Sequence, residues 1–191
     1  MLLGVAALAI ASSASAAVMP LDTGVAPWLY NGLPVAIEPT ATIPSAWMTP
    51  TGSSSWVGTT VTDATKGVPP GTYIFTLDLS SYAGAPGSFS LSYATDNSVA
   101  WTISNGSLGG ATTCTNAGDC FQTSGGAPRA LTGTYGVGAI LTATVTNDPS
   151  GSNPMGLLVS GTASGGVPEP STYAMVGIGA AAVLLSRLRR A

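Results

Sequence analysis

The chain of 191 residues contains no histidine. Histidine is the commonest general base at neutral pH and the partner of serine or cysteine in most nucleophilic hydrolases. Its absence therefore excludes Ser-His-Asp and Cys-His catalysis and any zinc site that needs imidazole. A Ser-Lys dyad in the body of the chain could use only Lys66, which stands beside Gly67 in a predicted turn. We therefore expect no catalytic residues of these kinds.

Charge is also scarce, since charged residues make up 7% of the chain, against about a quarter in typical soluble proteins. Between the two ends of the chain, Lys66 and Arg129 stand against seven acidic residues. Such a net negative surface repels the phosphate backbone, so we expect no binding to nucleic acid. Serine, threonine, asparagine and glycine have to supply the polar surface, which is typical of an extracellular β-protein.

Cysteine occurs only twice, at Cys114 and Cys120. Two thiols are too few ligands for a structural metal site, and their spacing does not fit a redox Cys-x-x-Cys motif. In an exported protein the expected state is a disulfide, which stabilises a loop this small by about 2 to 3 kcal/mol at most. We expect neither a metal site nor a cofactor.

Apolar residues alternate with polar ones in several short runs, a pattern that predicts β-strands. The runs are Tyr73-Phe75-Leu77-Leu79, Phe89-Leu91-Tyr93, Val99-Trp101-Ile103, Leu141-Ala143-Val145 and Met155-Leu157-Val159, with earlier candidates at 28–30, 46–48 and 56–61. Turn signals separate them, such as Pro69-Pro70-Gly71 and Asn105-Gly106. The sequence therefore predicts an all-β fold, a single β-sandwich or jelly roll over residues 17–166.

The N-terminus has the pattern of a secretory signal peptide at residues 1–16. Leu2 to Ala11 is apolar, and Ala14-Ser15-Ala16 provides an A-x-A cleavage site. The usual positive n-region is missing, because no lysine or arginine precedes Lys66. Either the true start lies upstream or the terminal amine alone supplies the charge. We expect export through the Sec translocon, followed by cleavage by signal peptidase.

The C-terminus, residues 167–191, combines three features in a fixed order. Val167-Pro168-Glu169-Pro170 precedes an apolar stretch that predicts a helix, and Arg187, Arg189 and Arg190 follow it. The sixteen residues from Ser171 to Ser186 would span about 24 Å as a helix, short for a bilayer core of about 30 Å. Snorkelling arginines reduce this shortfall, and the positive-inside rule leaves them in the cytoplasm. A buried core helix and an ordinary single-pass anchor are the alternatives.

This order resembles the PEP-CTERM sorting signal of bacterial envelope proteins. The resemblance implies that an exosortase, a membrane-embedded processing enzyme, cuts near Pro168 to Pro170 and releases or transfers the exported part. It also implies a precursor anchored transiently in the inner membrane and a mature protein at the cell surface or outside the cell. Prolines on both sides of Glu169 favour an extended peptide, which suits recognition by a processing enzyme.

The body between the two signals resembles the galactose-binding-domain-like jelly roll over about Ser45 to Ala163. The segments that carry this resemblance are 70–75, 94–99, 103–106, 143–147 and 156–159. The insert from Gly109 to Arg129, which holds both cysteines, departs from the pattern. The family binds its ligands in loops at one end of the sandwich, but no ligand residue can be assigned from it here.

Candidate site residues in the body are few. Trp47 and Trp56 flank a loop rich in Thr, Gly and Ser, where exposed indoles could stack on sugars, although tryptophans in such positions more often serve packing. Asp78 and Asp96 are the carboxylates to consider for glycoside cleavage, against roles as a surface residue and a turn former. We expect a non-enzymatic envelope or exopolysaccharide-associated protein. A carbohydrate-binding module and a carbohydrate-active enzyme are the alternatives.

Overall fold

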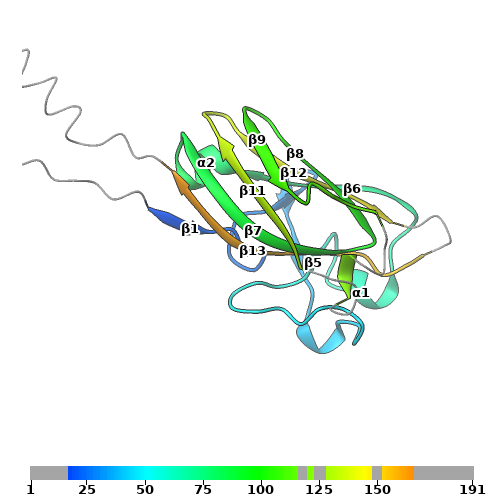
Figure 1. Cartoon of the computed structure of the whole chain (residues 1–191). Coiled ribbons are helices and arrows are strands. Elements are labelled where there is room, and N and C mark those ends of the chain that lie inside the picture. The colour runs from blue at the N-terminus through cyan, green and yellow to red at the C-terminus, as the bar shows by residue number, and fades with distance from the viewer. Residues whose placement is uncertain (1–16, 116–119, 123–127, 148–151, 166–191) are drawn as a thin grey trace, which may run out of the picture.

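A computed structural model describes residues 17–115, 120–122, 128–147 and 152–165. The predicted signal peptide at 1–16 and the predicted sorting segment at 167–191 lie outside these residues. The described chain forms two antiparallel sheets (Figure 1), and buried side chains from both form one core. The all-β class and the sandwich predicted from the sequence are thus confirmed.

The first sheet, sheet A, has the order β4-β5-β13-β7-β11-β9 in the described part of the chain, and β1 also pairs with β13. Its strands are β1 (Val18–Pro20), β4 (Ala36–Ile37), β5 (Val57–Gly58), β7 (Gly87–Asp96), β9 (Gly106–Gly110), β11 (Arg129–Tyr135) and β13 (Gly156–Gly165). The second, sheet B, has the order β10-β8-β12-β6-β2-β3. Its strands are β2 (Leu29–Tyr30), β3 (Leu33–Pro34), β6 (Gly71–Asp78), β8 (Ser98–Ile103), β10 (Thr113–Cys114) and β12 (Ile140–Asn147).

The chain crosses between the sheets repeatedly, since β6, β8 and β12 belong to sheet B while β7, β11 and β13 belong to sheet A. Helical segments are short: η1 (Thr40–Thr42), α1 (Asp63–Lys66) and α2 (Leu79–Ala83). No helix among the described residues is long and apolar enough to cross a membrane.

The alternation predicted from the sequence positions the core. In β12, Leu141, Ala143 and Val145 are buried while the residues between them are more exposed. The same pattern holds in β6 and β8 and in part of β7 and β13, whereas residues 93–96 of β7 and 156–159 of β13 are all buried. Their inward side chains form one cluster between the sheets, and its large members include Trp28, Phe75, Leu77, Tyr93, Trp101, Leu131, Leu141, Leu157 and Val159.

The structure differs from the sequence prediction in several places. Leu79 begins α2 instead of extending β6, because the Asp78 side chain accepts a hydrogen bond from the Ser81 backbone N–H and caps the helix. Residues 46–48, predicted as a strand, form no strand, and only Val57–Gly58 of the run at 56–61 is extended. Six strands of the described chain were not predicted, namely β1, β3, β4, β9, β10 and β11.

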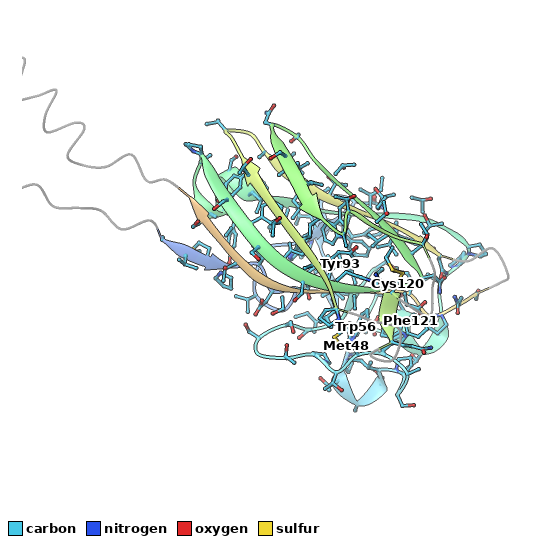
Figure 2. The ribbon with its side chains drawn as sticks, viewed as in Figure 1. Met48, Trp56, Tyr93, Cys120 and Phe121 are labelled. Carbon is cyan, nitrogen blue, oxygen red and sulfur yellow. A yellow bond between two sulfur atoms is a disulfide. The ribbon has the colours of Figure 1, made fainter. Side chains whose placement is uncertain are left out.

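A second, smaller cluster lies apart from the main core. Trp47, Trp56 and Ala64 pack on Ala94 of β7 and Leu158 of β13, with Ile43, Met48 and Phe121 at its edge. Figure 2 shows Met48, Trp56 and Phe121 gathered beside one end of sheet A. Because Ala94 and Leu158 alternate with inward residues, this cluster covers part of the outer face of the sheet.

Candidate functional site

The rest of that outer face is lined by hydroxyl groups. We call the following nine residues the hydroxyl face: Ser88, Ser90 and Ser92 of β7, Ser160, Thr162 and Ser164 of β13, Thr132 and Thr134 of β11, and Ser107 of β9. All nine are exposed or partly exposed. Their inward neighbours, such as Leu91 and Leu131, are buried in the core. The same period-two alternation that builds the core therefore presents the hydroxyls to solvent.

Strand register arranges these hydroxyls in rows across the sheet. Ser88 lies opposite both Ser164 and Thr134, and Ser90 lies opposite both Thr162 and Thr132. Neighbouring strands are about 4.8 Å apart, and successive outward residues on one strand about 6.8 Å apart. The face is therefore a regular array of groups that both donate and accept hydrogen bonds.

Some of the hydroxyls bond to each other. The Ser107 and Thr134 Oγ atoms are 2.8 Å apart, and those of Ser88 and Ser164 are 3.3 Å apart. Each hydroxyl has more hydrogen-bonding capacity than one such contact uses. The array therefore keeps donors and acceptors for water or a ligand.

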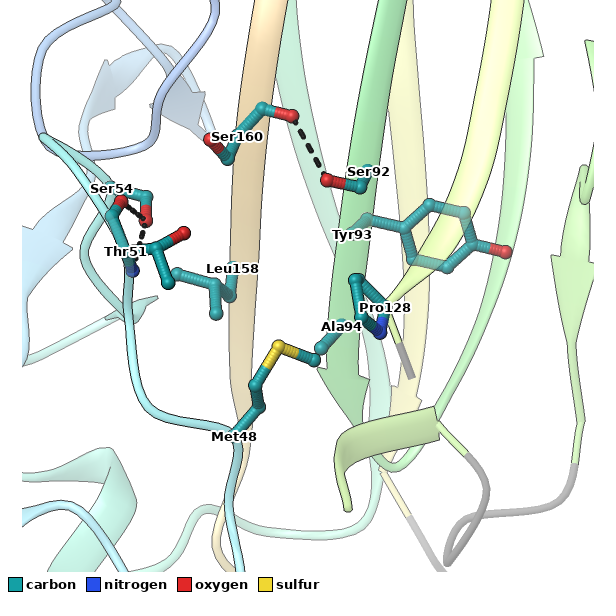
Figure 3. A pocket seen from close by; sticks show the side chains of 9 residues that line it. All are labelled: Met48, Thr51, Ser54, Ser92, Tyr93, Ala94, Pro128, Leu158 and Ser160. Atoms are coloured by element: carbon teal, nitrogen blue, oxygen red, sulfur yellow. Dashed lines mark hydrogen bonds between the residues drawn. The ribbon is translucent and has the colours of Figure 1, made fainter. Parts of the chain in front are cut away.

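Two hollows lie on this face. A small pocket lies where the array meets the loop at 48–54 (Figure 3) and holds about 250 Å³ of empty space, including part of the solvent at its mouth. Ser92 and Ser160 form one wall, Thr51 and Ser54 another, and Met48 and Leu158 its apolar floor. This volume is below the roughly 300 to 1,000 Å³ of sites that enclose a whole small molecule. The second hollow is shallower and runs over β7, β9 and β11, lined by Ser88, Ser107, Thr132 and Thr134 among others.

None of the nine residues of the hydroxyl face carries a charge. Four of the acidic residues in the described chain are buried, namely Asp22, Glu38, Asp63 and Asp96. Lys66 and Asp78 are exposed on short helical segments or their caps, and Arg129 is partly buried. The scarcity of charge in the sequence is therefore greater still on the described surface.

The two tryptophans predicted as sugar platforms are not exposed. Trp47 is 5% and Trp56 0% exposed, and their ring centroids lie 4.3 Å apart. Both indole N–H groups are used inside the protein, Trp47 donating to Asp96 Oδ2 and Trp56 to the Met48 carbonyl. The expectation of exposure was wrong, because the small residue Gly156 lets both rings pack onto the sheet: a Cβ there would lie 2.9 Å from Trp47 and 3.0 Å from Trp56.

The predicted disulfide is confirmed: Cys114 and Cys120 are bonded, with Cα atoms 5.8 Å apart. The bond links Cys114 of β10, at the edge of sheet B, to Cys120, which directly precedes Phe121. Phe121 in turn packs against the tryptophan cluster, and its carbonyl accepts a hydrogen bond from the Met48 backbone N–H. The disulfide thus anchors one side of the layer that covers the sheet.

The structure does not bring Asp78 and Asp96 together. Asp78 ends β6 opposite Ile140, at the end of the sandwich where β7 begins, whereas Asp96 is the last residue of β7. The length of β7 separates them by about 30 Å, far beyond the roughly 5 to 10 Å between the carboxyls of a glycosidase. This pair cannot cleave a glycoside.

Asp96 has a structural environment. Its carboxylate accepts hydrogen bonds from Trp47 Nε1 and Asn97 Nδ2, and burial raises its pKa to about 6. Asn97 is held by Asn153, whose Nδ2 donates to Asn97 Oδ1 at 2.9 Å. Asp96, considered as a turn former from the sequence, therefore also holds the loop that carries Trp47, through its hydrogen bond with the indole.

A different carboxylate pair, Glu38 and Asp63, was not found from the sequence. Asp63 accepts hydrogen bonds from the backbone N–H groups of Thr59 and Thr60, and Glu38 accepts one from Ala64 N–H at 3.2 Å. Burial raises the pKa of Glu38 to about 7, and the nearby Asp63 adds to this. Both side chains are at most 2% exposed, so no substrate reaches them. The nearest sequence signal is the run of threonines before Asp63, which supplies most of its donors.

Metal ligands are not grouped in the described part of the chain: it holds no cluster of three or more acidic or cysteine side chains that could bind an ion. The acidic residues Asp119 and Asp148 lie outside the described residues.

One comparison with known protein families found a match, and it concerns the C-terminus. Residues 166–190 match the model of the PEP-CTERM protein-sorting motif. This segment is a PEP-CTERM sorting signal. The PEP-CTERM match includes Val167, Pro168, Glu169, Pro170 and the three arginines, and it indicates an exported protein with an exosortase as its processing partner. Searches of curated proteins and of solved structures found no match. The galactose-binding-like resemblance of the body is therefore supported only by its β-rich sandwich.

Proposed function

We propose that this protein is a non-enzymatic envelope component that an exosortase processes and that then associates with a neutral exopolysaccharide through its hydroxyl face. The single observation that carries the second part is the uncharged array of nine Ser and Thr side chains in register on sheet A. Polysaccharides present their own hydroxyls at regular intervals along an extended chain. A flat array of donors and acceptors matches such a polymer better than it matches a compact ligand.

The chemistry of the face also limits the partner. Without a positive side chain, the face has no group to pair with the carboxylates or sulfates of an acidic polymer. Without an exposed aromatic ring among its nine residues, it depends on hydrogen bonds rather than stacking. Each such bond contributes only about 0.5–1.5 kcal/mol, so affinity requires a long polymer that engages several rows at once.

The small pocket in Figure 3 extends this surface. Ser92 and Ser160 belong both to the array and to the pocket wall. A side branch of the polymer could enter between them and the apolar floor formed by Met48 and Leu158. This would add apolar contact to a surface that otherwise offers hydroxyls.

The experiment compares two matched substitutions in the processed protein. Ser90→Ala with Thr132→Val removes two adjacent hydroxyls from the array with little change in shape. Thr144→Val makes the same chemical change on the outer face of sheet B. We expect the double variant to weaken retention on the producing cell's neutral exopolysaccharide about tenfold, the loss of two hydrogen bonds, and Thr144→Val to bind normally. Equal retention of all three proteins, or no retention of the unmodified one, would contradict the proposal.

The sorting part has its own test. Replacing Pro168 and Pro170 with alanine should leave unprocessed precursor in the membrane fraction, because the extended triplet is lost. Normal processing of that variant would refute the assignment of the motif.

A further inference from the structure

The first and the last strand of the described domain, β1 and β13, lie side by side, so the chain enters and leaves the domain at the same end. Strand β1 pairs with the end of β13, Val18 lying opposite Ser164 and Pro20 opposite Thr162. In Figure 1 the blue start of β1 and the orange end of β13 lie side by side. We call this the exit end of the sandwich.

The last strand is held to its final residue. Gly165 pairs with Gly87 and is buried, and α2 packs against β13. A Cβ on Gly165 would collide with the carbonyl oxygens of Ala83 and Gly84. The ordered domain therefore continues to Gly165 without a loose linker before it.

The sorting signal begins very close to the end of β13 in the sequence, since Pro168 is only three residues beyond Gly165. Three residues span at most about 11 Å when fully extended. An enzyme that holds the Pro-Glu-Pro triplet must therefore approach the exit end closely, unless the end of β13 unpairs from both β1 and β7.

The exit end presents a braced apolar turn. The residues between β11 and β12 include Val137, which is 78% exposed, the largest value among the exposed apolar side chains of the described chain, and Ile140, which follows, is 42% exposed. Asn105 fixes this turn from one side, donating to the Val137 carbonyl at 3.2 Å, and Ser80 of α2 from the other, accepting from Gly138 N–H at 3.1 Å. Register places the turn at this end, because Tyr135 lies opposite Gly87, the partner of Gly165.

The charges at this end favour a protein partner over a lipid surface. Both basic residues of the described chain lie toward the opposite end: Arg129 faces Tyr93, and Lys66 precedes Gly67, which lies against Asn153. Among the described residues, the charged side chains near the exit end are carboxylates, namely Asp78, opposite Ile140, and Asp22, whose Oδ1 accepts from the Gly161 backbone N–H. Anionic lipid headgroups attract lysine and arginine, and in the described part of the chain neither lies near this end.

We propose that the exit end, through Val137 and Ile140, is a docking surface for the exosortase, so that the enzyme reads the folded domain together with the Pro-Glu-Pro triplet. This rests on the proposed exosortase processing. The braced turn costs little entropy to bind because it is already ordered.

The test measures processing of the full chain in cells that contain the exosortase, by pulse-chase conversion of precursor to the processed form. Val137→Asn with Ile140→Thr should slow conversion at least fivefold. Val61→Asn, a change at an exposed valine beside α1, should process at the unmodified rate. The thermal unfolding of the processed proteins should match, which separates lost docking from misfolding.

A second variant distinguishes docking from simple proximity. Ten Gly and Ser residues inserted between Gly165 and Gly166 should also slow conversion, and the Val137 and Ile140 changes should then add little. Faster conversion after insertion would mean that the domain merely obstructs the enzyme and would overturn the inference, as would normal conversion of the Val137 and Ile140 variant. If the processed protein instead binds phosphatidylethanolamine–phosphatidylglycerol vesicles through Val137 and conversion is unchanged, the surface is a lipid contact and the inference fails. An unmodified chain that is never converted would refute the proposed processing itself.

Discussion

The outer face of sheet A has two halves that differ although the same strands build both. In the open half, the outward residues of β7 and β13 are hydroxyl-bearing, namely Ser88, Ser90 and Ser92 and Ser160, Thr162 and Ser164. In the covered half they are Ala94, Leu158 and Gly156, and the tryptophan cluster packs over them. The inward residues of both strands are apolar or small along both halves. Packing therefore determines which residues occupy the covered half. The open half is free of packing demands, and its hydroxyls reflect contact with solvent or a ligand.

The largest difference between the halves should appear on truncating Trp56. It is fully buried and contacts Trp47 and Gly156. Trp56→Ala should lower the free energy of unfolding by about 3–5 kcal/mol, since the cavity cannot refill. Urea denaturation of the processed protein measures this. A loss below about 1 kcal/mol would show that the covered half is not a packed core.

The disulfide should contribute less to the free energy of unfolding than Trp56 does. Its contribution should stabilise the covered half. Cys114→Ser with Cys120→Ser should lower the free energy of unfolding by about 2–3 kcal/mol at most. It should also shift tryptophan fluorescence to the red, because Phe121 and Met48 lose their anchor. Reduction of the unmodified protein should reproduce both effects. Two free thiols in the mature, unreduced protein would contradict the assignment.

The free energy of unfolding should also depend on pH, through buried carboxyls that hold the covered half in place. The pKa of Asp96 is raised by burial to about 6 from 3.8, so between these values the folded state keeps a proton that the unfolded state has released. The free energy of unfolding should therefore fall as pH rises through this window, by about 3 kcal/mol. Glu38, whose pKa is raised to about 7 from 4.5, should extend the fall toward neutral pH.

Urea denaturation across this range, with Asp96→Asn and Glu38→Gln, measures the slope that each carboxyl contributes. Asp78→Asn is the control, because hydrogen bonds from Ser81 and Ser80 lower the pKa of that exposed carboxyl, and its effect has the opposite sign at lower pH. Stability that rises from pH 4 to pH 7 would contradict the assignment.

The open half should show the smallest change. Ser90→Ala with Thr132→Val should alter the free energy of unfolding by no more than about 0.5 kcal/mol, because both side chains are exposed. The same denaturation experiment measures it. A loss comparable with that of Trp56→Ala would mean that the hydroxyl rows hold the sheet together, and their composition would then need no ligand.

Much of the fold could be predicted because burial on one face leaves a period of two. Phe89, Leu91 and Tyr93 identify β7 from their spacing alone. Strand β11 was not predicted because Gly133 occupies an inward position and interrupts the apolar pattern. The hydroxyl face could not be predicted as a site, since its rows depend on which strands are neighbours. Trp47 and Trp56 were misplaced because their neighbours in sequence are polar, while their contacts, Ala94, Gly156 and Leu158, are distant in the chain.

The local properties of this protein follow from its amino-acid sequence: the sorting signal, the strand alternation, the lack of histidine and charge, and the pairing of the two cysteines. Each depends on residues close together in the chain or on composition. Which surface is open follows from the tertiary structure, because exposure depends on long-range packing. The tertiary structure buried both tryptophans, separated Asp78 from Asp96, and aligned serines and threonines of four strands into one face. It also paired β13 as far as Gly165, so that the sorting signal begins just beyond the described domain.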